Sequence, residues 1–416
     1  MKYYLCIDMK CFYASVECVL RGLDPFKTDL VVADPDRSKN TICLAITPKM
    51  KKRGVKNRCR LMDIPKYIHP IIAKPRMRKY MEYSAKIYKI FLKYVSEEDI
   101  HVYSVDESFL DISNYLHMYK KNPIEMAKMI LDDIYNTLGL TATCGVGTNM
   151  YLCKIALDII SKHSPTNIGY LNERLYKEKL WHHTPLTDFW QIGRGIENRL
   201  HKLHIKDMYD VAHFNEKRLF KEFGVNAQLL IDHSKGIETC IIKDIKNYKP
   251  KSKSISNSQI LFEDYNFDNA RIILTEMIDN LVLRLVKKKL YTNNVGFSIG
   301  FSKDICPPQS ISMKLNHASN SFGYISEQII NEYNYRINDK LPIRRIGIWF
   351  GNLTNKRIEQ LDLFSSLEKE DDDYKVEQAI NNIKSKFGKN AILRGVSLTD
   401  KATQKERNKM VGGHNG

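Results

Sequence analysis

The sequence predicts an α+β protein of several domains, and three observations support this class. The chain has 416 residues, more than the roughly 250 to 300 at which a single hydrophobic core stops growing, so about two to four domains are expected. Short apolar runs typical of strands alternate with longer runs of helical periodicity over most of the chain. After residue 352 the composition changes, and an acidic stretch follows.

The first part of the chain predicts a mixed sheet with helices. The expected strands are short and apolar, and they lie at 3–8, 100–105, 108–112 and 142–146. Apolar residues at helical spacing predict two helices, at 77–95 and about 124–138. Between the first strand and the first helix lies a basic block, from Lys49 to Arg60. This block is either a solvated helix face or a phosphate-binding surface.

Three carboxylates stand in or beside the expected strands: Asp8, Asp106 and Glu107. Two carboxylates about 4 Å apart repel by ~4 kcal/mol at an effective dielectric constant near 20, so three together call for cations. Mg²⁺ takes oxygen ligands and is usually held by one or two carboxylates together with substrate phosphates. The acids therefore indicate a metal site for phosphoryl transfer. An Asp-Glu pair in an apolar stretch is also common at the tip of a hairpin.

The residues around these acids resemble the Y-family lesion-bypass DNA polymerases, the DinB/UmuC group. The family's first motif has a strand Asp, an aromatic turn and Ala-x-Val-Glu, and it is matched by Ile7 to Glu17. The signature Ser-[Ile/Val]-Asp-Glu-[Ala/Ser]-[Phe/Tyr]-Leu-Asp is matched by Ser104 to Asp111, and Gly-Val-Gly before Lys-x-Ala by Gly145 to Ala156. Within the family the chain is most similar to the UmuC-like proteins of Gram-positive bacteria and their plasmids and phages.

The resemblance implies a right-hand polymerase with small fingers and a helical thumb. The implied parts are a palm at 1–22 and 78–165, fingers at 23–77, a thumb with a helix-hairpin-helix at 166–240, a linker at 241–254, a little finger at 255–352 and a tail at 353–416. In the little finger we expect three strands and two helices, at 256–261, 295–301, 343–350, 270–289 and 324–338. One further helix is expected at 374–387, in a segment to which we assign no function.

The resemblance also assigns catalytic roles. It implies addition of a deoxynucleotide to a primer 3′ end, with Asp8 and Asp106 each bridging two Mg²⁺ ions. The Met9 carbonyl would complete the nucleotide-side ion, and Glu107 would hold the primer-side ion; Mn²⁺ is an alternative to Mg²⁺. Tyr13 falls where the family places its steric gate, a ring beneath the sugar that excludes a ribose 2′-OH. Its alternative role is that of a core aromatic beside Phe12.

Two lysines are candidates for binding the triphosphate. Lys162 matches the family's triphosphate-binding lysine, although the helix macrodipole also favours a lysine in a last helical turn. Many relatives have a Tyr in the fingers, followed three residues later by an Arg, where this chain has Pro48 and Lys51. The Lys51 ammonium supplies charge but no planar fork. We therefore expect a phosphate contact from Lys51 and none from Pro48.

Contacts with DNA are expected in three places. Gly193 and Gly195 would let a tight turn bring backbone N–H groups to a phosphate, although glycine also ends helices. Further candidates are basic side chains of the linker and the little finger: Lys251, Lys253, Arg344 and Arg345. The formal charge of +17 favours a polyanionic partner, and nucleic acid before a membrane.

The tail contains a match to the bacterial sliding-clamp motif, Gln-Leu-x-Leu-Phe. The match runs from Gln360 through Leu361 and Leu363 to Phe364. By this resemblance Leu363 and Phe364 would fill an apolar pocket of the clamp and Gln360 a polar one, a recurring mode of peptide recognition.

Cysteine usage and hydropathy indicate a compartment. The nine cysteines include no Cys-x-x-Cys pair, and with no signal peptide this favours reduced thiols in a cytosol. No apolar run approaches the ~18 residues of a membrane span. We therefore expect a cytoplasmic monomer without a membrane anchor.

The sequence thus predicts a low-fidelity DNA polymerase for translesion synthesis in DNA repair and damage tolerance, in an SOS-type response. Its expected partners are primer–template DNA, deoxynucleoside triphosphates and the sliding clamp. One alternative is a non-catalytic relative that binds DNA or the clamp and regulates replication and repair. Another is a different palm-type nucleotidyl transferase, such as a nucleotide cyclase, which would need neither the thumb hairpin nor the clamp motif.

Overall fold

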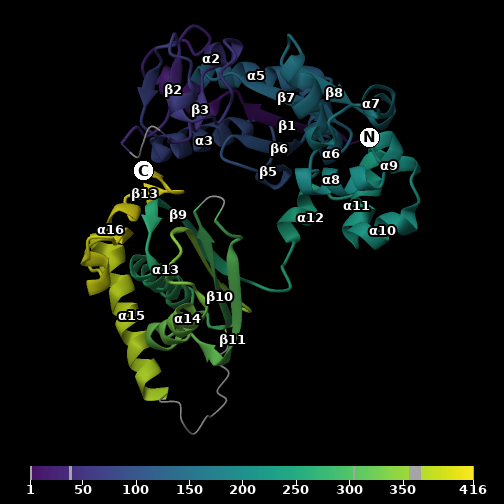
Figure 1. Cartoon of the computed structure of the whole chain (residues 1–416). Helices are drawn as coiled ribbons and strands as arrows, with labels where there is room; N and C mark the ends of the chain where they lie inside the picture. The colour runs from purple at the N-terminus through teal and green to yellow at the C-terminus, as the bar shows by residue number, and fades with distance from the viewer. Residues whose placement is uncertain (1, 37–39, 303–304, 356–366, 416) are drawn as a thin grey trace. The chain divides into compact units, whose positions relative to one another are not determined.

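The chain forms two compact units, Met1–Tyr248 and Lys249–Gly416 (Figure 1). The computed structural model describes residues 2–36, 40–302, 305–355 and 367–415. Both units combine helices with strands, which confirms the predicted α+β class. The boundary between them falls inside the predicted linker. The first part of that linker is a helix, α12 (Ile242–Asn247), because Ile242 is buried against the first unit.

The first unit is built on a five-stranded sheet. Its order is β5-β6-β1-β7-β8, and the strands are β5 (Ile100–Val102), β6 (Glu107–Asp111), β1 (Tyr4–Met9), β7 (Ala142–Gly147) and β8 (Ile168–Leu171). β1 is central and pairs antiparallel with both β6 and β7. Its alternate side chains enter two different cores: Leu5 and Ile7 pack on one face, Tyr4 and Cys6 on the other. Burial on both faces explains why this strand is mainly apolar, with Asp8 near its end as the exception.

Helices cover both faces of this sheet. One face carries α1 (Phe12–Val19), α3 (Met77–Phe91) and α5 (Pro123–Leu138). The other carries α6 (Met150–Ile155). The predicted helices at 77–95 and 124–138 correspond to α3 and α5. The predicted strand at 100–105 ends early, because residues 103–106 form the turn of a hairpin between β5 and β6.

Two glycines allow α6 to lie directly on β7. A Cβ atom at Gly145 would stand 1.9 Å from the carbonyl oxygen of Cys153, and one at Gly147 would stand 2.2 Å from the Cys153 nitrogen. No side chain fits in either space. The Gly-Val-Gly motif is therefore a close-packing requirement between strand and helix.

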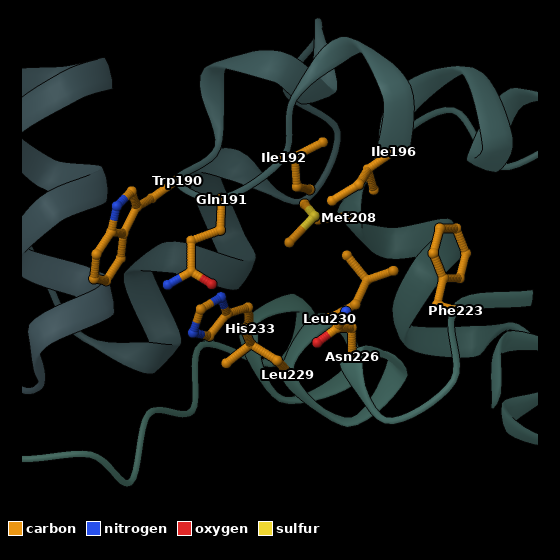
Figure 2. A pocket seen from close by; sticks show the side chains of 10 residues that line it. All are labelled: Trp190, Gln191, Ile192, Ile196, Met208, Phe223, Asn226, Leu229, Leu230 and His233. Atoms are coloured by element: carbon orange, nitrogen blue, oxygen red, sulfur yellow. The ribbon is translucent and has the colours of Figure 1, made fainter. Parts of the chain in front are cut away.

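A small three-stranded sheet and a helical region complete the first unit. The small sheet has the order β3-β2-β4 and consists of β3 (Ala45–Ile46), β2 (Leu30–Val32) and β4 (Ile71–Ala73), with α2 (Pro48–Lys52) beside it. The helical region comprises α7 (Glu173–Leu180), α8 (Arg194–Lys202), α9 (Met208–His213), α10 (Glu216–Phe223) and α11 (Asn226–Ser234). A pocket of about 230 Å³ lies among α8 to α11, lined mainly by apolar side chains such as Ile192, Met208 and Leu230 (Figure 2).

The second unit contains a four-stranded antiparallel sheet of order β11-β10-β12-β9. The strands are β11 (Gln309–Ser319), β10 (Thr292–Phe301), β12 (Ile343–Gly351) and β9 (Ile255–Tyr265). Two helices, α13 (Phe267–Lys287) and α14 (Phe322–Arg336), pack on one face of this sheet. Three strands and both helices match the predicted ones, whereas β11 was not predicted. β11 is an edge strand in which Ser, Lys and Asn separate the apolar residues.

The C-terminal residues also belong to the second unit. Helix α15 (Leu367–Phe387) begins seven residues before the predicted helix at 374–387 and packs along α13 (Figure 1). The carboxylate of Glu370 accepts a hydrogen bond of 2.9 Å from the Ser319 hydroxyl. Beyond α15, the buried carboxylate of Glu276 accepts the N–H groups of Thr403 at 2.9 Å and Gln404 at 3.1 Å. The helix α16 (Gln404–Arg407) is thereby fixed to α13.

Two further predictions concern membrane-spanning helices and the limits of the domains. In the described ranges, none of the helices has the length and hydropathy of a membrane span. The limits of palm, fingers, thumb, little finger and tail stay predictions, because the structure divides the chain only at residue 248.

Gly145→Ala is expected to destabilise the first unit by at least ~2 kcal/mol, because the new methyl group must push strand and helix apart. Urea unfolding of the full chain measures the effect. Gly195→Ala is the matched control: its surroundings are open, so we expect a change of less than ~1 kcal/mol. Equal stability of the two variants would contradict the close-packing role of Gly145.

Candidate active site

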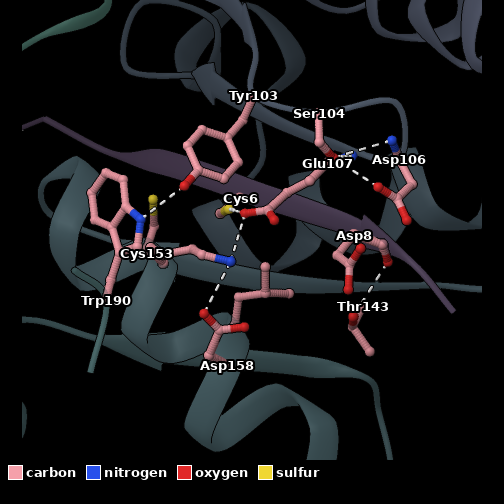
Figure 3. A network of polar contacts seen from close by, with 12 residues as sticks. Cys6, Asp8, Tyr103, Ser104, Asp106, Glu107, Thr143, Cys153, Asp158 and Trp190 are labelled. Carbon is pink, nitrogen blue, oxygen red and sulfur yellow. Dashed lines mark hydrogen bonds and ion pairs between the residues drawn. The ribbon is translucent and has the colours of Figure 1, made fainter. Parts of the chain in front are cut away.

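The fold brings Asp8 together with Asp106 and Glu107, which lie roughly 100 positions later in the sequence. The pairing of β1 with β6 sets Asp8 directly opposite Glu107. The N–H of Met9 donates to the Asp106 carbonyl at 3.1 Å, which fixes the hairpin turn to the end of β1. Asp106 therefore lies at a hairpin tip, as the alternative interpretation required, and still belongs to the cluster (Figure 3).

Asp8 is the most perturbed acid of this cluster. Burial, together with the negative charges of Asp106 and Glu107, raises the pKa of Asp8 from its ordinary value of 3.8 to about 7. The cations of Lys162 and Lys154 oppose this shift but do not cancel it. The site thus holds more negative charge than the chain itself neutralises.

Lys154 compensates Glu107. Its ammonium lies 2.7 Å from the Glu107 carboxylate and 2.9 Å from that of Asp158, one turn further along the chain. Burial disfavours the charged form of Lys154, but the surrounding acidic groups outweigh it and raise the pKa of Lys154. The thiol of Cys6 also donates to Glu107, at 3.1 Å (Figure 3). The sequence showed Lys154 only as the first residue of the Lys-x-Ala motif, although its i,i+4 spacing from Asp158 indicates an ion pair.

The acids suit a divalent cation in charge and donor type. Carboxylate oxygens are the ligands of hard cations, and a dication would relieve the repulsion that raises the pKa of Asp8. The arrangement is not a complete site, however: across the described ranges no three His, Cys, Asp or Glu side chains are grouped to hold a metal. Glu107 faces Lys154, and Asp106 accepts the Ser104 hydroxyl at 2.7 Å.

Tyr13 is fixed by a network that the sequence did not reveal. Its ring stacks on that of Tyr80, with the centroids 4.4 Å apart. The Tyr80 hydroxyl donates to Glu17 at 2.8 Å, and Arg76 donates to the same carboxylate at 2.6 and 2.9 Å. Burial would raise the pKa of Glu17, but these hydrogen bonds, with one from Arg21, lower it. The ring of Tyr13 is close enough to Asp106 for its charge to raise the pKa of Tyr13, after burial.

The two candidate phosphate-binding lysines lie at the borders of the acid cluster. Lys162 pairs with Asp158 at 2.8 Å, and its charge opposes the rise in the pKa of Asp8. Lys51, on α2, acts on Cys11 in the turn that follows β1. Pro48 is buried in the first turn of α2, where a proline suits the helix start. The Lys51 ammonium can therefore contribute positive charge next to the acids, while Pro48 has a packing role.

The glycines expected at DNA lie at the start of a helix. Gly193 caps the N-terminus of α8, and Gly195 is the second residue of that helix. Neither has an atom within 4 Å of where a Cβ would stand. The first N–H groups of a helix have no partner within it, so this helix end is open to an anion.

The basic candidates in the second unit differ from one another. Lys251 and Lys253 are exposed, and the Lys253 carbonyl accepts the Leu353 N–H at 3.1 Å. Arg345 is exposed on the face of the sheet that α13 and α14 leave open, because its register neighbours Gly300 and Ile260 lie on that face. Arg344 instead pairs with Asp264 at 3.4 Å. The clamp-motif residues Gln360, Leu361, Leu363 and Phe364 lie outside the described residues.

Comparison with known proteins supplies the family. Residues 7–158 match the model of the impB/mucB/samB family, and residues 252–363 match that of its C-terminal domain. A protein named putative UV-damage repair protein UvrX, from Bacillus subtilis (strain 168), is 32% identical over 99% of this chain and 97% of its own. The chain belongs to the impB/mucB/samB family. It is a UmuC-like Y-family DNA polymerase.

Two other relatives of this polymerase agree. DNA polymerase IV 2 of Bacillus subtilis (strain 168) is 28% identical over 98% of the chain and 97% of its own length. The solved structure of a Y-family DNA polymerase chimera matches 85% of the chain and all of its own, with a TM-score of 0.64 and 22% identity. The predicted right-hand polymerase fold is thereby confirmed, and the protein is a DNA-directed DNA polymerase.

Asp8→Asn is expected to stabilise the polymerase at pH 8, with a gain that shrinks as the pH falls towards 4. The folded pKa lies above the ordinary value, so the folded state binds the proton more tightly than the unfolded chain. Stability is therefore lost as the pH rises, by up to ~1.4 kcal/mol per unit between about 4 and about 7. Urea unfolding of both proteins at several pH values measures this. A gain independent of pH would contradict the raised pKa.

Proposed function

We propose that this polymerase performs low-fidelity translesion synthesis by two-metal nucleotidyl transfer, in DNA repair and damage tolerance of the SOS type. The observation that carries the proposal is the meeting of Asp8, Asp106 and Glu107, in which burial and then the charges of the other two acids raise the pKa of Asp8. Paired Mg²⁺ ions, or Mn²⁺ in their place, would activate the primer hydroxyl and neutralise charge on the triphosphate. The carboxylates and the Met9 carbonyl would hold them.

The chain's own residues supply position and charge. Lys154 lies 2.7 Å from the Glu107 carboxylate and offsets part of its charge, while Glu107 still acts on Asp8 as a member of the cluster. Lys162, whose charge acts on Asp8, and Lys51, whose charge acts on Cys11, bind the triphosphate. Preorganised cations of this kind stabilise the charge that develops during phosphoryl transfer.

Tyr13 acts as the steric gate. Stacking on Tyr80 fixes the position of the Tyr13 ring, and a hydrogen bond from the Tyr80 hydroxyl to Glu17 fixes Tyr80 in turn. A gate excludes a 2′-OH only if its ring does not yield, because a rotated side chain would admit the hydroxyl. The ion pair between the buried Glu17 and the partly exposed Arg76 supplies this rigidity.

Backbone contacts and basic side chains hold the DNA. The open N-terminus of α8, at Gly193 and Gly195, binds a phosphate, as do Lys251, Lys253 and Arg345, with a weaker contribution from the paired Arg344. Each phosphate neutralised lowers log K by about 0.9 per decade of salt, so DNA binding weakens steeply with salt. Clamp binding through Gln360, Leu361, Leu363 and Phe364 would compensate by raising the effective concentration at the primer.

One observation favours the alternative of a non-catalytic DNA- or clamp-binding regulator. Glu107 is paired with Lys154, and within the described part of the chain the acids do not form a complete metal group. A regulator would keep the fold and the DNA contacts and would not need the ions. Direct measurement of nucleotide addition separates the two.

Primer extension with and without Mg²⁺ tests the proposed function. The wild type is expected to extend a primer only with the metal, and Asp106→Ala is expected to lower the rate by at least about 100-fold. Asp132→Ala, an exposed acid of α5, is the matched control and should retain full activity. Extension by Asp106→Ala at the wild-type rate would contradict the metal role. A wild type inactive with both Mg²⁺ and Mn²⁺ would support the regulator.

Tyr13→Ala is expected to raise ribonucleotide insertion relative to deoxynucleotide insertion by about tenfold or more, which corresponds to ~1.4 kcal/mol of lost discrimination. Single-nucleotide insertion kinetics with paired substrates measure the ratio. Tyr13→Phe keeps the ring and should keep the selectivity. If Tyr13→Ala inserts both sugars in the wild-type ratio, Tyr13 is a core aromatic and not the gate.

A further inference from the structure

The second unit contains a basic pocket that the proposed function does not use. Its volume is about 420 Å³, and it lies between α13, the end of α15 and α16, beside β9. Five cationic side chains line it: Arg284, Lys287, Lys384, Lys389 and Arg407. Amide side chains make up much of the remaining wall, and no Asp or Glu is among the described lining residues.

The positive charge of this basic pocket is largely unpaired. In the described ranges, the ammonium groups of Lys287, Lys384 and Lys389 have no hydrogen bond or ion pair. The carboxylates that act on Lys384, those of Asp279 and Glu377, are both paired with Arg394. Burial lowers the pKa of Lys384. Lys287 and Lys389 are exposed and Lys384 is half-buried, so the pocket presents unpaired positive charge where an anion from solvent can reach it.

Among the described residues, the two arginines of the pocket hydrogen-bond to neutral groups alone, although the charge of Glu276 also acts on Arg407. Arg407 donates to the side-chain oxygens of Gln259 and Asn257, the latter at 3.3 Å. Burial lowers the pKa of Arg407. The Arg284 guanidinium donates one long hydrogen bond in the part of the chain that the structure describes, to the Ser256 carbonyl at 3.4 Å. Charge-assisted hydrogen bonds to phosphate are the strong interactions for which guanidinium groups are suited.

Amide groups make the pocket rigid. Gln404 accepts from Asn280 at 2.5 Å and donates to Asn408 at 2.7 Å. Asn381 donates to the Leu283 carbonyl at 3.0 Å, which ties α15 to α13. With Glu276 holding the start of α16, the walls are fixed before a ligand arrives. Preorganisation of this kind favours binding of a compact ligand.

The pocket is separate from the open face of the sheet. On β9, Asn257 pairs with Ile348, whose side chain enters the core, so Asn257 lies on the helix-covered side. Arg345 and Ile260, a register pair, lie on the opposite side. The volume is within the roughly 300 to 1,000 Å³ of small-molecule sites, whereas a DNA backbone follows extended surfaces.

We infer that this pocket binds the phosphate chain of a small polyphosphate of nucleotide size. Five cations match several phosphate charges, and the amides can accept or donate hydrogen bonds to the rest of such a molecule. Inorganic and nucleoside polyphosphates share this chemistry. The pocket exists only because the C-terminal residues dock on α13, so it gives the segment after α15 a binding function.

Isothermal titration of the full chain with tripolyphosphate, in EDTA, tests the inference. EDTA removes metal-dependent binding at the acid cluster, so the result does not depend on the proposed catalytic role. The double variant Lys287→Gln, Lys384→Gln is expected to weaken binding by at least about tenfold. The control Lys288→Gln, Lys386→Gln removes the same charge from adjacent positions outside the pocket and should change binding by less than about twofold. A deoxynucleoside triphosphate, titrated in the same way, distinguishes a nucleotide ligand from an inorganic one.

Three results would overturn the inference. The first is a wild type that does not bind either polyphosphate. The second is equal weakening by the pocket variant and its control, which would mean that net charge alone attracts the anion. The third is loss of duplex DNA affinity in the pocket variant with polyphosphate binding unchanged, which would make the DNA backbone the ligand. None of these results bears on primer extension, so failure here leaves the proposed function intact.

Discussion

The antiparallel pairing of β1 with β6 is the constraint on which the active site depends. It sets Asp8 against Glu107, and the turn before β6 adds Asp106. Burial, followed by repulsion from Asp106 and Glu107, raises the pKa of Asp8. The pairing persists because β1 is the central strand, bonded along both edges and packed into cores on both faces. Folding free energy from elsewhere in the unit thus maintains a cluster that would not form by itself.

Asp8 in β1 and Glu17 in α1 show two opposite ways of accommodating a carboxylate away from water. Glu17 receives hydrogen bonds from Arg76, Arg21 and Tyr80, and its pKa is lowered. Asp8 has two further carboxylates as neighbours, and its pKa is raised. Hydrogen bonds from the protein offset the charge of Glu17, so its role is structural. The cluster at Asp8 retains negative charge that an external cation can neutralise. In this chain the structural acid also supports the Tyr80 ring on which Tyr13 stacks.

The second unit distributes its charges in a related way. Asp371 and Asp372 of its acidic stretch are exposed. Glu370, however, accepts the Ser319 hydroxyl, and Asp373 accepts the Gly323 N–H at 3.2 Å at the start of α14. These two acids are thereby used in docking α15, while basic side chains of α13 and α15 remain around the pocket. The opposite face of the sheet carries small residues, such as Ser258, Ser298 and Gly347, beside Arg345. The indole of Trp349, the register partner of Gly296, covers part of the same face.

The sequence by itself determined the family, the α+β class, most strands and helices, and the three acids, because motifs and apolar periodicity are local properties of the chain. It missed β11, whose apolar residues are separated by polar ones, and it placed the start of α15 too late, in a stretch of charged residues. Only the tertiary structure decided that Lys154 pairs with Glu107, that Tyr80 and Glu17 support Tyr13, and that the C-terminal segment closes a basic pocket. Each of these contacts joins residues far apart in the sequence, and packing between elements, which no local pattern encodes, selects the partner.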